Sequence, residues 1–315
     1  MGKRKARRLL GLAVSAGALG VSAAHAQERE MPIPDPAAQG AQSEGASESS
    51  AREQLPLWEL RFGASGLIAP SYPASDHYQL RGVGAPLFVY RGERIRIGGD
   101  EPNAAARAIA ISQRTFELDL SVDAAYGADS SENDARAGMP DLDTQLEIGP
   151  QLTINLQDTG WTDEGRRRLR LLLPVRHVGA TDFKNYEELG FLFQPALTYR
   201  RQFPGERMMS FSTTFAVTFA TEGVHEYYYG VDPAFATPVR PAYEAEGGYL
   251  GAHLQFSGRT EIFEDTHLFV TYRMRSLDGA ASQESPLHRE NLTHALSLSL
   301  VWTAFRSREA ARDRE

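Results

Sequence analysis

The sequence contains no cysteine among its 315 residues, and its mean hydropathy is low, at −0.38. The absence of cysteine excludes a disulfide scaffold and zinc sites built on thiolates. A mean hydropathy this low excludes a bundle of transmembrane helices. Basic residues are also scarce. Beyond the first 26 residues, 28 lysines and arginines stand against 41 acidic residues, which argues against a nucleic-acid-binding protein.

The N-terminal residues have the pattern of an export signal. Basic residues crowd into the first eight positions, an apolar stretch follows over residues 9–24, and residues 24–26 form a small-residue cleavage motif. This order predicts a signal peptide over residues 1–26. Residues 27–55 have almost no large apolar side chain. Such a segment cannot bury enough surface to offset its ordering entropy, so we expect a disordered periplasmic tether.

From residue 56 onward, apolar and polar residues alternate, which is typical of strands with two different faces. The alternation is clear from Leu146 to Leu156 and from Leu296 to Trp302. About twelve such segments occur, at residues 57–69, 85–91, 93–99, 106–112, 115–127, 144–157, 166–178, 189–202, 207–229, 244–260, 266–278 and 291–305.

The connections between these segments alternate between long and short. The long ones are rich in Asp, Gly, Ser and Pro and cover residues 70–84, 128–143, 179–188, 230–243 and 279–290. An even strand number, with short turns on one side and long loops on the other, predicts a transmembrane antiparallel β-barrel over residues 56–305. Both chain ends then lie on the periplasmic side, where a polar tail over residues 306–315 follows.

A secreted β-sandwich also has alternating strands. Many of these segments have 11 residues or more, enough to cross a bilayer at a tilt, and aromatics such as Trp58 and Tyr272 stand near segment ends. These features favour a barrel in the outer membrane. One alternative stays open at its end: Phe305 is out of phase with Leu296–Trp302, so either Trp302 ends the strand or a β-bulge shifts the phase.

The polar faces of the segments line the barrel interior if the apolar faces meet lipid. Acidic side chains from neighbouring strands then face basic ones. The predicted lumen charges are Glu117, Asp119, Asp123, Glu147, Arg168, Arg170, Arg176, Arg273 and Arg275, joined by Arg94 and Arg96 if the third segment is a strand. Either the charges pair and fill a narrow barrel, since an unpaired buried charge is costly, or they flank water and select polar solutes.

The sequence carries no recognisable catalytic motif. The run from Gly63 to Gly66 lacks the spacing of a nucleophile elbow, and no two histidines have metal-ligand spacing. We therefore expect no enzymatic activity, no cofactor and no metal. The acidic residues of the 128–143 connection are either a solvated charged loop or a divalent-cation site near lipopolysaccharide. They are Asp129, Glu132, Asp134, Asp141 and Asp143.

Several short motifs, in their order and spacing, resemble the MipA/OmpV family. The most telling residues are Tyr228, Tyr229, Gly230 and Val231, followed by Pro241 and Tyr243; earlier motifs lie at residues 70–72 and 86–92. The resemblance covers residues 58–305. It implies an outer-membrane barrel that scaffolds murein-synthesising enzymes by bridging a lytic transglycosylase and a penicillin-binding protein. Other family members are described as porin-like or as adhesins.

Taken without the resemblance, the tyrosines at 227–229 suggest an interfacial aromatic belt at the outer end of the ninth strand, rather than ligand stacking. The function we expect is a non-enzymatic scaffold in the outer membrane, surrounded by lipid and lipopolysaccharide. A narrow diffusion pore for small polar solutes and an adhesin are the alternatives.

Overall fold

The computed structural model describes residues 55–92, 95–98, 106–112, 115–205 and 209–311. The predicted signal peptide (1–26) and almost all of the predicted tether (27–55) lie outside the described residues. So do Arg94 and the side chain of Arg96. No helix within the described part of the chain is long and apolar enough to cross a membrane.

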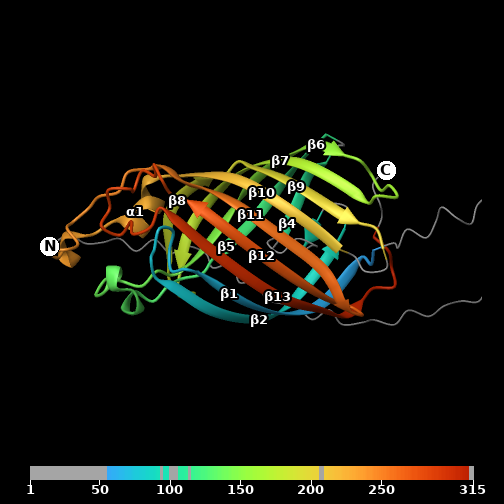
Figure 1. The fold of residues 1–315 in the computed structure, drawn as a ribbon, viewed down its shortest axis with the longest axis horizontal. Coiled ribbons are helices and arrows are strands. Elements are labelled where there is room, and N and C mark those ends of the chain that lie inside the picture. Colours follow the sequence, from blue (N-terminus) through green and yellow to red (C-terminus); the bar gives the residue numbers. More distant parts are fainter. Residues whose placement is uncertain (1–54, 93–94, 99–105, 113–114, 206–208, 312–315) are drawn as a thin grey trace, which may run out of the picture. The chain divides into compact units, whose positions relative to one another are not determined.

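Strands dominate the described chain (Figure 1). They are β1 (Trp58–Pro70), β2 (Tyr78–Arg91), β3 (Ile95–Ile97), β4 (Ala106–Ser112), β5 (Phe116–Ala125), β6 (Thr144–Asp158), β7 (Arg166–Thr181), β8 (Tyr186–Phe193), β9 (Ala196–Phe203), β10 (Met209–Ala220), β11 (Gly248–Phe263), β12 (Thr266–Ser276) and β13 (Leu292–Arg306). The helices are α1 (Glu222–Tyr229) and the 3-10 helices η1 (Ser130–Glu132), η2 (Asp134–Arg136) and η3 (Pro233–Phe235).

The strands form one antiparallel sheet that closes into a barrel. Strands adjacent in the chain pair with one another around the wall, and β13 pairs with β1 to complete the circle. The exception is β8 and β9, which lie end to end, because both pair with β7 on one side and with β10 on the other. With β8 and β9 counted together, the thirteen strands of the described chain occupy twelve positions around the wall, in agreement with the predicted number of about twelve, although β3 has only three residues.

The interruption between β8 and β9 falls at Gln194 and Pro195, inside the predicted segment 189–202. Proline has no N–H to donate to a neighbouring strand, so the ladder cannot run through it unchanged. Two backbone hydrogen bonds bridge the break: Gln194 N donates to Pro174 O at 3.3 Å, and Val217 N donates to Pro195 O at 3.1 Å. The wall is continuous there although the strand is not.

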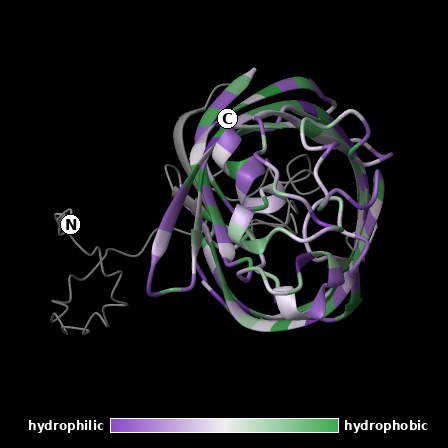
Figure 2. Cartoon of the chain, turned by 90° about the vertical axis from the view of Figure 1, so that its left-hand side faces the viewer, coloured by the Kyte–Doolittle hydropathy of each residue, from purple (hydrophilic) through white to green (hydrophobic). Residues whose placement is uncertain are grey.

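The outer surface of the barrel is apolar, as the alternation predicts. The exposed large side chains occupy every second position on successive strands, and Figure 2 shows the corresponding alternation of green and purple around the wall. On three strands they are Leu146 and Ile148 of β6, Phe211, Phe215 and Phe219 of β10, and Leu296, Leu298, Leu300 and Trp302 of β13. A closed wall that presents such side chains on its outside suits a bilayer.

A β-bulge resolves the phase of Phe305. In the pairing of β1 with β13, Leu60 stands opposite Phe305 but Arg61 stands opposite Thr303, so Ala304 is the extra residue. The bulge moves Phe305 onto the exposed face that Trp302 occupies. Of the two alternatives, the shifted phase is the correct one, and the last strand continues to Arg306.

Two predicted boundaries are wrong. The ninth segment (207–229) does not stay extended: β10 ends at Ala220 and α1 begins at Glu222. The buried residues of α1 include His225 and Tyr229, four positions apart, which is the period of a helix and not of a strand. The second segment is longer than predicted (85–91), since β2 pairs with β1 from Tyr78 onward and leaves only residues 71–77 as the connection.

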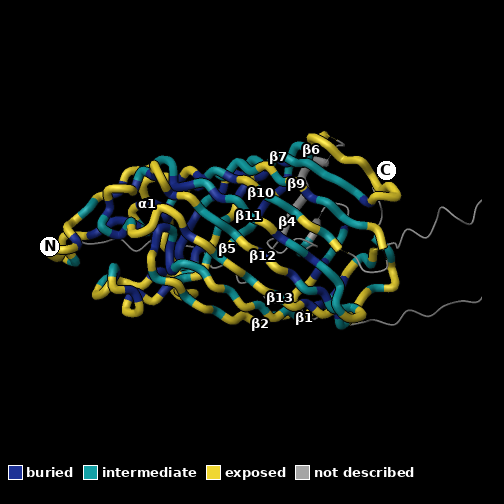
Figure 3. The backbone as a smooth tube through the Cα atoms, viewed as in Figure 1, coloured by how far each residue is buried: buried dark blue, intermediate teal, exposed yellow. Residues whose placement is uncertain are grey.

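The two ends of the barrel differ. At one end, here called the turn end, lie the short connections 159–165 and 264–265 together with both ends of the described chain, where Leu57 N donates to Glu309 O at 2.8 Å. At the opposite end, here called the cap end, lie the long connections 71–77, 126–143, 221–247 and 277–291 and the short connection 182–185. Buried residues gather at the cap end (Figure 3).

Candidate functional site

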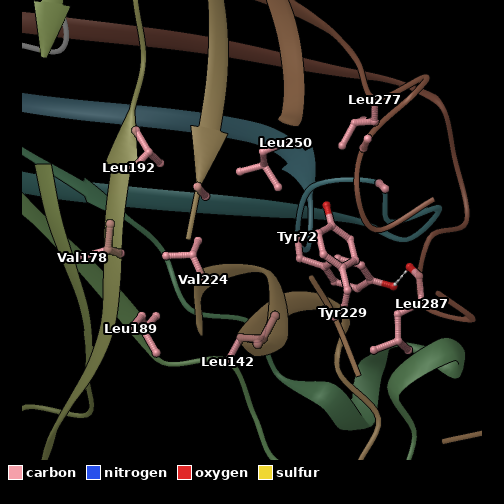
Figure 4. Packing of buried hydrophobic residues seen from close by; sticks show 14 of the residues in the cluster. Tyr72, Leu142, Val178, Leu189, Leu192, Val224, Tyr229, Leu250, Leu277 and Leu287 are labelled. Atoms are coloured by element: carbon pink, nitrogen blue, oxygen red, sulfur yellow. Dashed lines mark hydrogen bonds between the residues drawn. The ribbon is translucent and has the colours of Figure 1, made fainter. Parts of the chain in front are cut away.

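The cap end is covered by a packed structure of its own, which we call the cap. It consists of the connections 71–77, 126–143, 221–247 and 277–291, and α1 and the loops lie across the barrel mouth (Figure 2). Its buried cluster draws on these connections and on the adjoining strand ends (Figure 4). The members with large side chains are Tyr72, Leu142, Val178, Leu189, Leu192, Val224, Tyr229, Val231, Leu250, Leu277 and Leu287.

Tyrosine hydroxyls tie the connections of the cap together. Tyr229, whose side chain is 0% exposed, donates to Pro73 O at 2.9 Å, and Tyr72 donates to Leu287 O at 2.8 Å (Figure 4). Tyr228 donates to the Gln145 side chain at 2.7 Å. Burial raises the pKa of Tyr72 to about 12, so its hydroxyl stays a donor at any physiological pH.

The family-motif residues therefore build the cap and do not form the predicted aromatic belt. Tyr228 and Tyr229 end α1, and Gly230 follows at its C-terminus with its N–H donating to Glu226 O. Val231 and Tyr243 pair through reciprocal backbone hydrogen bonds of 2.9 and 3.1 Å, closing the loop after the helix. Pro241 lies exposed in that loop.

Two acidic residues of the 128–143 connection stabilise the loop itself. Asp129 accepts the Ser131 N–H at 2.7 Å, and Asp141 accepts the Ser130 N–H at 2.8 Å. The hydrogen bonds from Ser131 hold the pKa of Asp129 below its ordinary value. No group of three metal-ligating side chains occurs among the residues that the structure describes. The 128–143 connection is a structured loop in which these two carboxylates accept backbone N–H groups.

His225 gives the cap a dependence on pH. Its side chain is fully buried, and Nε2 lies 3.3 Å from Gly248 O. Burial lowers its pKa from 6.5, so the folded cap keeps the ring neutral. Below about pH 6.5 the unfolded cap takes up a proton that the folded cap does not, so cap stability is complete above that pH and falls as the pH drops.

We expect the cap to lose about 1 kcal/mol of stability for each pH unit below 6.5, until the folded pKa is reached. Limited proteolysis of the cap loops at pH 7.5 and pH 5.5 measures this loss. A His225→Gln variant supplies the control, because glutamine does not titrate in this range. Equal acid sensitivity in the variant would show that another group is responsible.

Beneath the cap, the barrel interior holds a cavity of about 590 Å³. Tyr72, Leu142, Val224 and Tyr228 of the cap form its ceiling, and the inward faces of the strands form its walls. Its charged lining residues are Arg81, Asp123, Asp143, Glu147, Arg176, Arg200, Arg273 and Arg275. Five of the nine predicted lumen charges therefore face this cavity.

One wall of the cavity carries a cluster around Arg176. Arg176 Nη1 lies 3.0 Å from Glu147 Oε2 and 3.6 Å from Asp123 Oδ2, and its Nε donates to Ser121 Oγ at 3.1 Å. These residues come from β5, β6 and β7, three adjacent strands. The acidic side chains therefore pair with a neighbour on the same wall, and they also lie within electrostatic range of Arg273 and Arg275 on β12, as the predicted facing of acidic and basic walls requires.

The inward faces of β11 and β12 carry basic and neutral polar side chains in the cavity lining, and no acidic ones. Arg273 Nε and Nη2 donate to Gln255 Oε1 at 2.9 and 2.7 Å. Arg275 stands opposite His253 in the strand register. The sequence prediction considered only charged residues and therefore missed Gln255 and His253 of the candidate site. The alternation along β11 places both on the inward face.

The other four predicted lumen charges lie nearer the turn end. Glu117 and Asp119 are on β5, Arg168 and Arg170 are on β7, and Asp119 is buried. Arg168 donates to the Gln202 side chain at 3.2 Å.

Glu59, which the sequence reasoning missed, pairs at the turn end with Arg61 and, at 3.0 Å, with Arg91. Glu59 and Arg61 alternate with Trp58, Leu60 and Phe62, so the period-two signal was sufficient to find them. The interior thus holds ion pairs both at the turn end, around Glu59, and in the polar cavity under the cap, around Arg176.

A closed barrel with an apolar outside and a charged inside defines a transmembrane β-barrel protein. A family model described as "MltA-interacting protein MipA" matches residues 62–304. The chain belongs to the MipA family and is an outer-membrane β-barrel protein. No curated protein sequence matches it.

Two solved structures are similar to this chain in outline. One, described as "CymD monoaromatic hydrocarbon channel", has a TM-score of 0.32 and 10% identity, covering 80% of this chain and 90% of that one. A FadL homologue of Pseudomonas aeruginosa has a TM-score of 0.20 and 8% identity, covering 79% of this chain and 90% of that one. At TM-scores this low, neither structure bears on a solute or a mechanism in this chain.

Proposed function

We propose that this chain is a non-enzymatic outer-membrane scaffold that binds periplasmic murein-remodelling enzymes, a lytic transglycosylase and a penicillin-binding protein among them. The observation that carries the proposal is the cap. A barrel whose mouth is covered by a packed cluster, and whose turn end holds the buried ion pairs of Glu59 with Arg61 and Arg91, is poorly suited to be an open pore. The family description, which names an interaction with MltA, supports the same role.

The turn end is the surface we assign to the partners, because the export route places the chain ends and short turns in the periplasm. It offers exposed aromatic side chains: Trp161 of the 159–165 connection is 49% exposed, and Phe263 at the end of β11 is 72% exposed. Exposed aromatics of this kind are frequent anchors of protein interfaces.

The scaffold role predicts that MltA binds the turn end. Immobilised, refolded protein should capture purified MltA, and the double variant Trp161→Ala/Phe263→Ala should weaken capture about tenfold or more, because two interface anchors are removed. The matched control is Phe183→Ala/Val239→Ala, which removes side chains 84% and 91% exposed from cap-end connections. Equal capture by both double variants would contradict the assignment.

A narrow diffusion pore is the second candidate, favoured by the polar cavity. Planar-bilayer recordings separate the two functions. The scaffold predicts silence from protein that is folded and heat-modifiable. A steady conductance would instead support the pore.

A further inference from the structure

Two arginines of β12 face the cavity without a carboxylate partner. Arg273 donates to the neutral amide of Gln255, and within the described residues neither Arg273 nor Arg275 forms an ion pair. The carboxylates of Glu147 and Asp123 form their ion pairs with Arg176 on another wall; they attract Arg273 and Arg275 electrostatically but form no ion pair with them. Arg273 and Arg275 are two positions apart on one strand, so both guanidinium groups project from the same face.

His253 supplies a second, independent sign of a missing ligand. It lies opposite Arg275 in the register of β11 and β12, lines the same cavity, and is only 7% exposed. Its Nδ1 has no hydrogen-bond partner among the described residues. A buried ring nitrogen without a partner costs free energy, and a polar group of a bound molecule at this position would remove that cost.

The rest of the lining is rich in neutral hydrogen-bonding groups. Amide side chains and hydroxyl groups from several strands line the same cavity as the two arginines, among them Gln151, Gln194, Ser212, Thr271, Thr293 and Ser297. A volume of about 590 Å³ is of the size that holds one small organic molecule. Hydroxyl groups on that molecule would find partners on every side.

We infer that the cavity is a binding site for a small hydroxylated organic anion, such as a sugar acid or a sugar phosphate. Its carboxylate or phosphate lies at Arg273 and Arg275, where planar guanidinium groups bind such oxygens in pairs. The His253 ring contacts the same head group, and the amides and hydroxyls bind the body of the molecule. This site is separate from the turn-end surface assigned to the scaffold role.

The test uses glucose 6-phosphate and glucuronate as probes, with glucose as the neutral control. The mature protein is refolded from urea into detergent micelles with a probe present, so that entry past the cap is not required, and bound probe is measured by equilibrium dialysis. Both anions should bind at least about tenfold more tightly than glucose, because charge-assisted hydrogen bonds are the stronger ones. The Arg273→Gln/Arg275→Gln variant should lose at least about tenfold in affinity for both anions.

Arg289→Gln is the matched control, since Arg289 pairs with Asp76 in the cap connections and does not line the cavity. Its affinity should equal that of the unaltered protein. If the double variant does not fold, competition takes its place: glucuronate should displace bound glucose 6-phosphate, and glucose should not. The inference would be overturned if neither anion bound, if glucose bound as tightly as the anions, or if the folded double variant kept its affinity.

Discussion

Removing the central part of the cap should open the cavity to water-borne reagents. The chain has no cysteine, so Ser297→Cys, on the inward face of β13, places a single thiol in the cavity lining. In the capped protein we expect a cationic methanethiosulfonate reagent to modify this thiol slowly. With residues 222–246 replaced by a short Gly-Ser turn, the rate should rise about 100-fold, which corresponds to a cap opening that costs roughly 3 kcal/mol.

The strand register makes this deletion feasible. Ala220 of β10 and Gly248 of β11 are directly paired, so a tight hairpin can join the two strands without disturbing the wall. The deletion removes Val224 and Tyr228, two of the four residues that form the ceiling over the cavity, and with Tyr229 the hydrogen bond to Pro73.

The control is Lys184→Cys, an exposed cap-end position whose modification rate should be the same with and without the cap. Fast modification of the Ser297→Cys protein while the cap is intact would mean that solutes reach the cavity by another route. It would also remove the main support for a non-conducting barrel.

The barrel was predictable because its signal is repeated. Alternation with period two recurs in strand after strand of the sequence, so a few wrong boundaries do not change the fold. The inward position of Arg176 or Glu147 follows from the same alternation, once the outside is known to be apolar. The sequence also indicated how β13 ends, since a β-bulge was one of the two explanations for the phase of Phe305, and the structure contains that bulge.

The cap was not predictable in this way. Its cluster joins residues that are far apart in the sequence, such as Tyr72 with Leu287 and Asn133 with Ser75. The alternation also misled at Val224 to Tyr229, where a short helix with mixed polar and apolar residues continues directly from a strand. Alternation shows which charged side chains point inward, but the strand register decides which of them meet. The sequence could therefore place Arg176 inside the barrel but could not identify its partners.

That register makes Arg176 the lumen residue whose loss should cost most. Its guanidinium is held between Glu147 and Asp123 and donates to Ser121, and the side chains of Arg176 and Glu147 are only 10% and 14% exposed. Arg176→Leu leaves the desolvated Glu147 carboxylate without its ion-pair partner, so that only the electrostatic attraction of Arg275 remains, whereas Asp123 is solvent-accessible enough to keep its hydration. Removing one partner of a buried ion pair costs about 3–5 kcal/mol, and we expect about 3 kcal/mol because the cavity admits some water.

Urea unfolding in micelles, followed by tryptophan fluorescence, measures this loss. The second substitution Glu147→Gln should restore about 2 kcal/mol to Arg176→Leu, because the penalty arises from the uncompensated charge and not from the missing arginine. Arg273→Gln is the matched control: it removes an arginine from the same cavity, but one bonded to a neutral amide, so it should cost less than about 1 kcal/mol. If Arg176→Leu and Arg273→Gln prove equally mild, cavity water screens the Arg176 cluster, and the paired charges on this wall contribute little to the stability of the barrel.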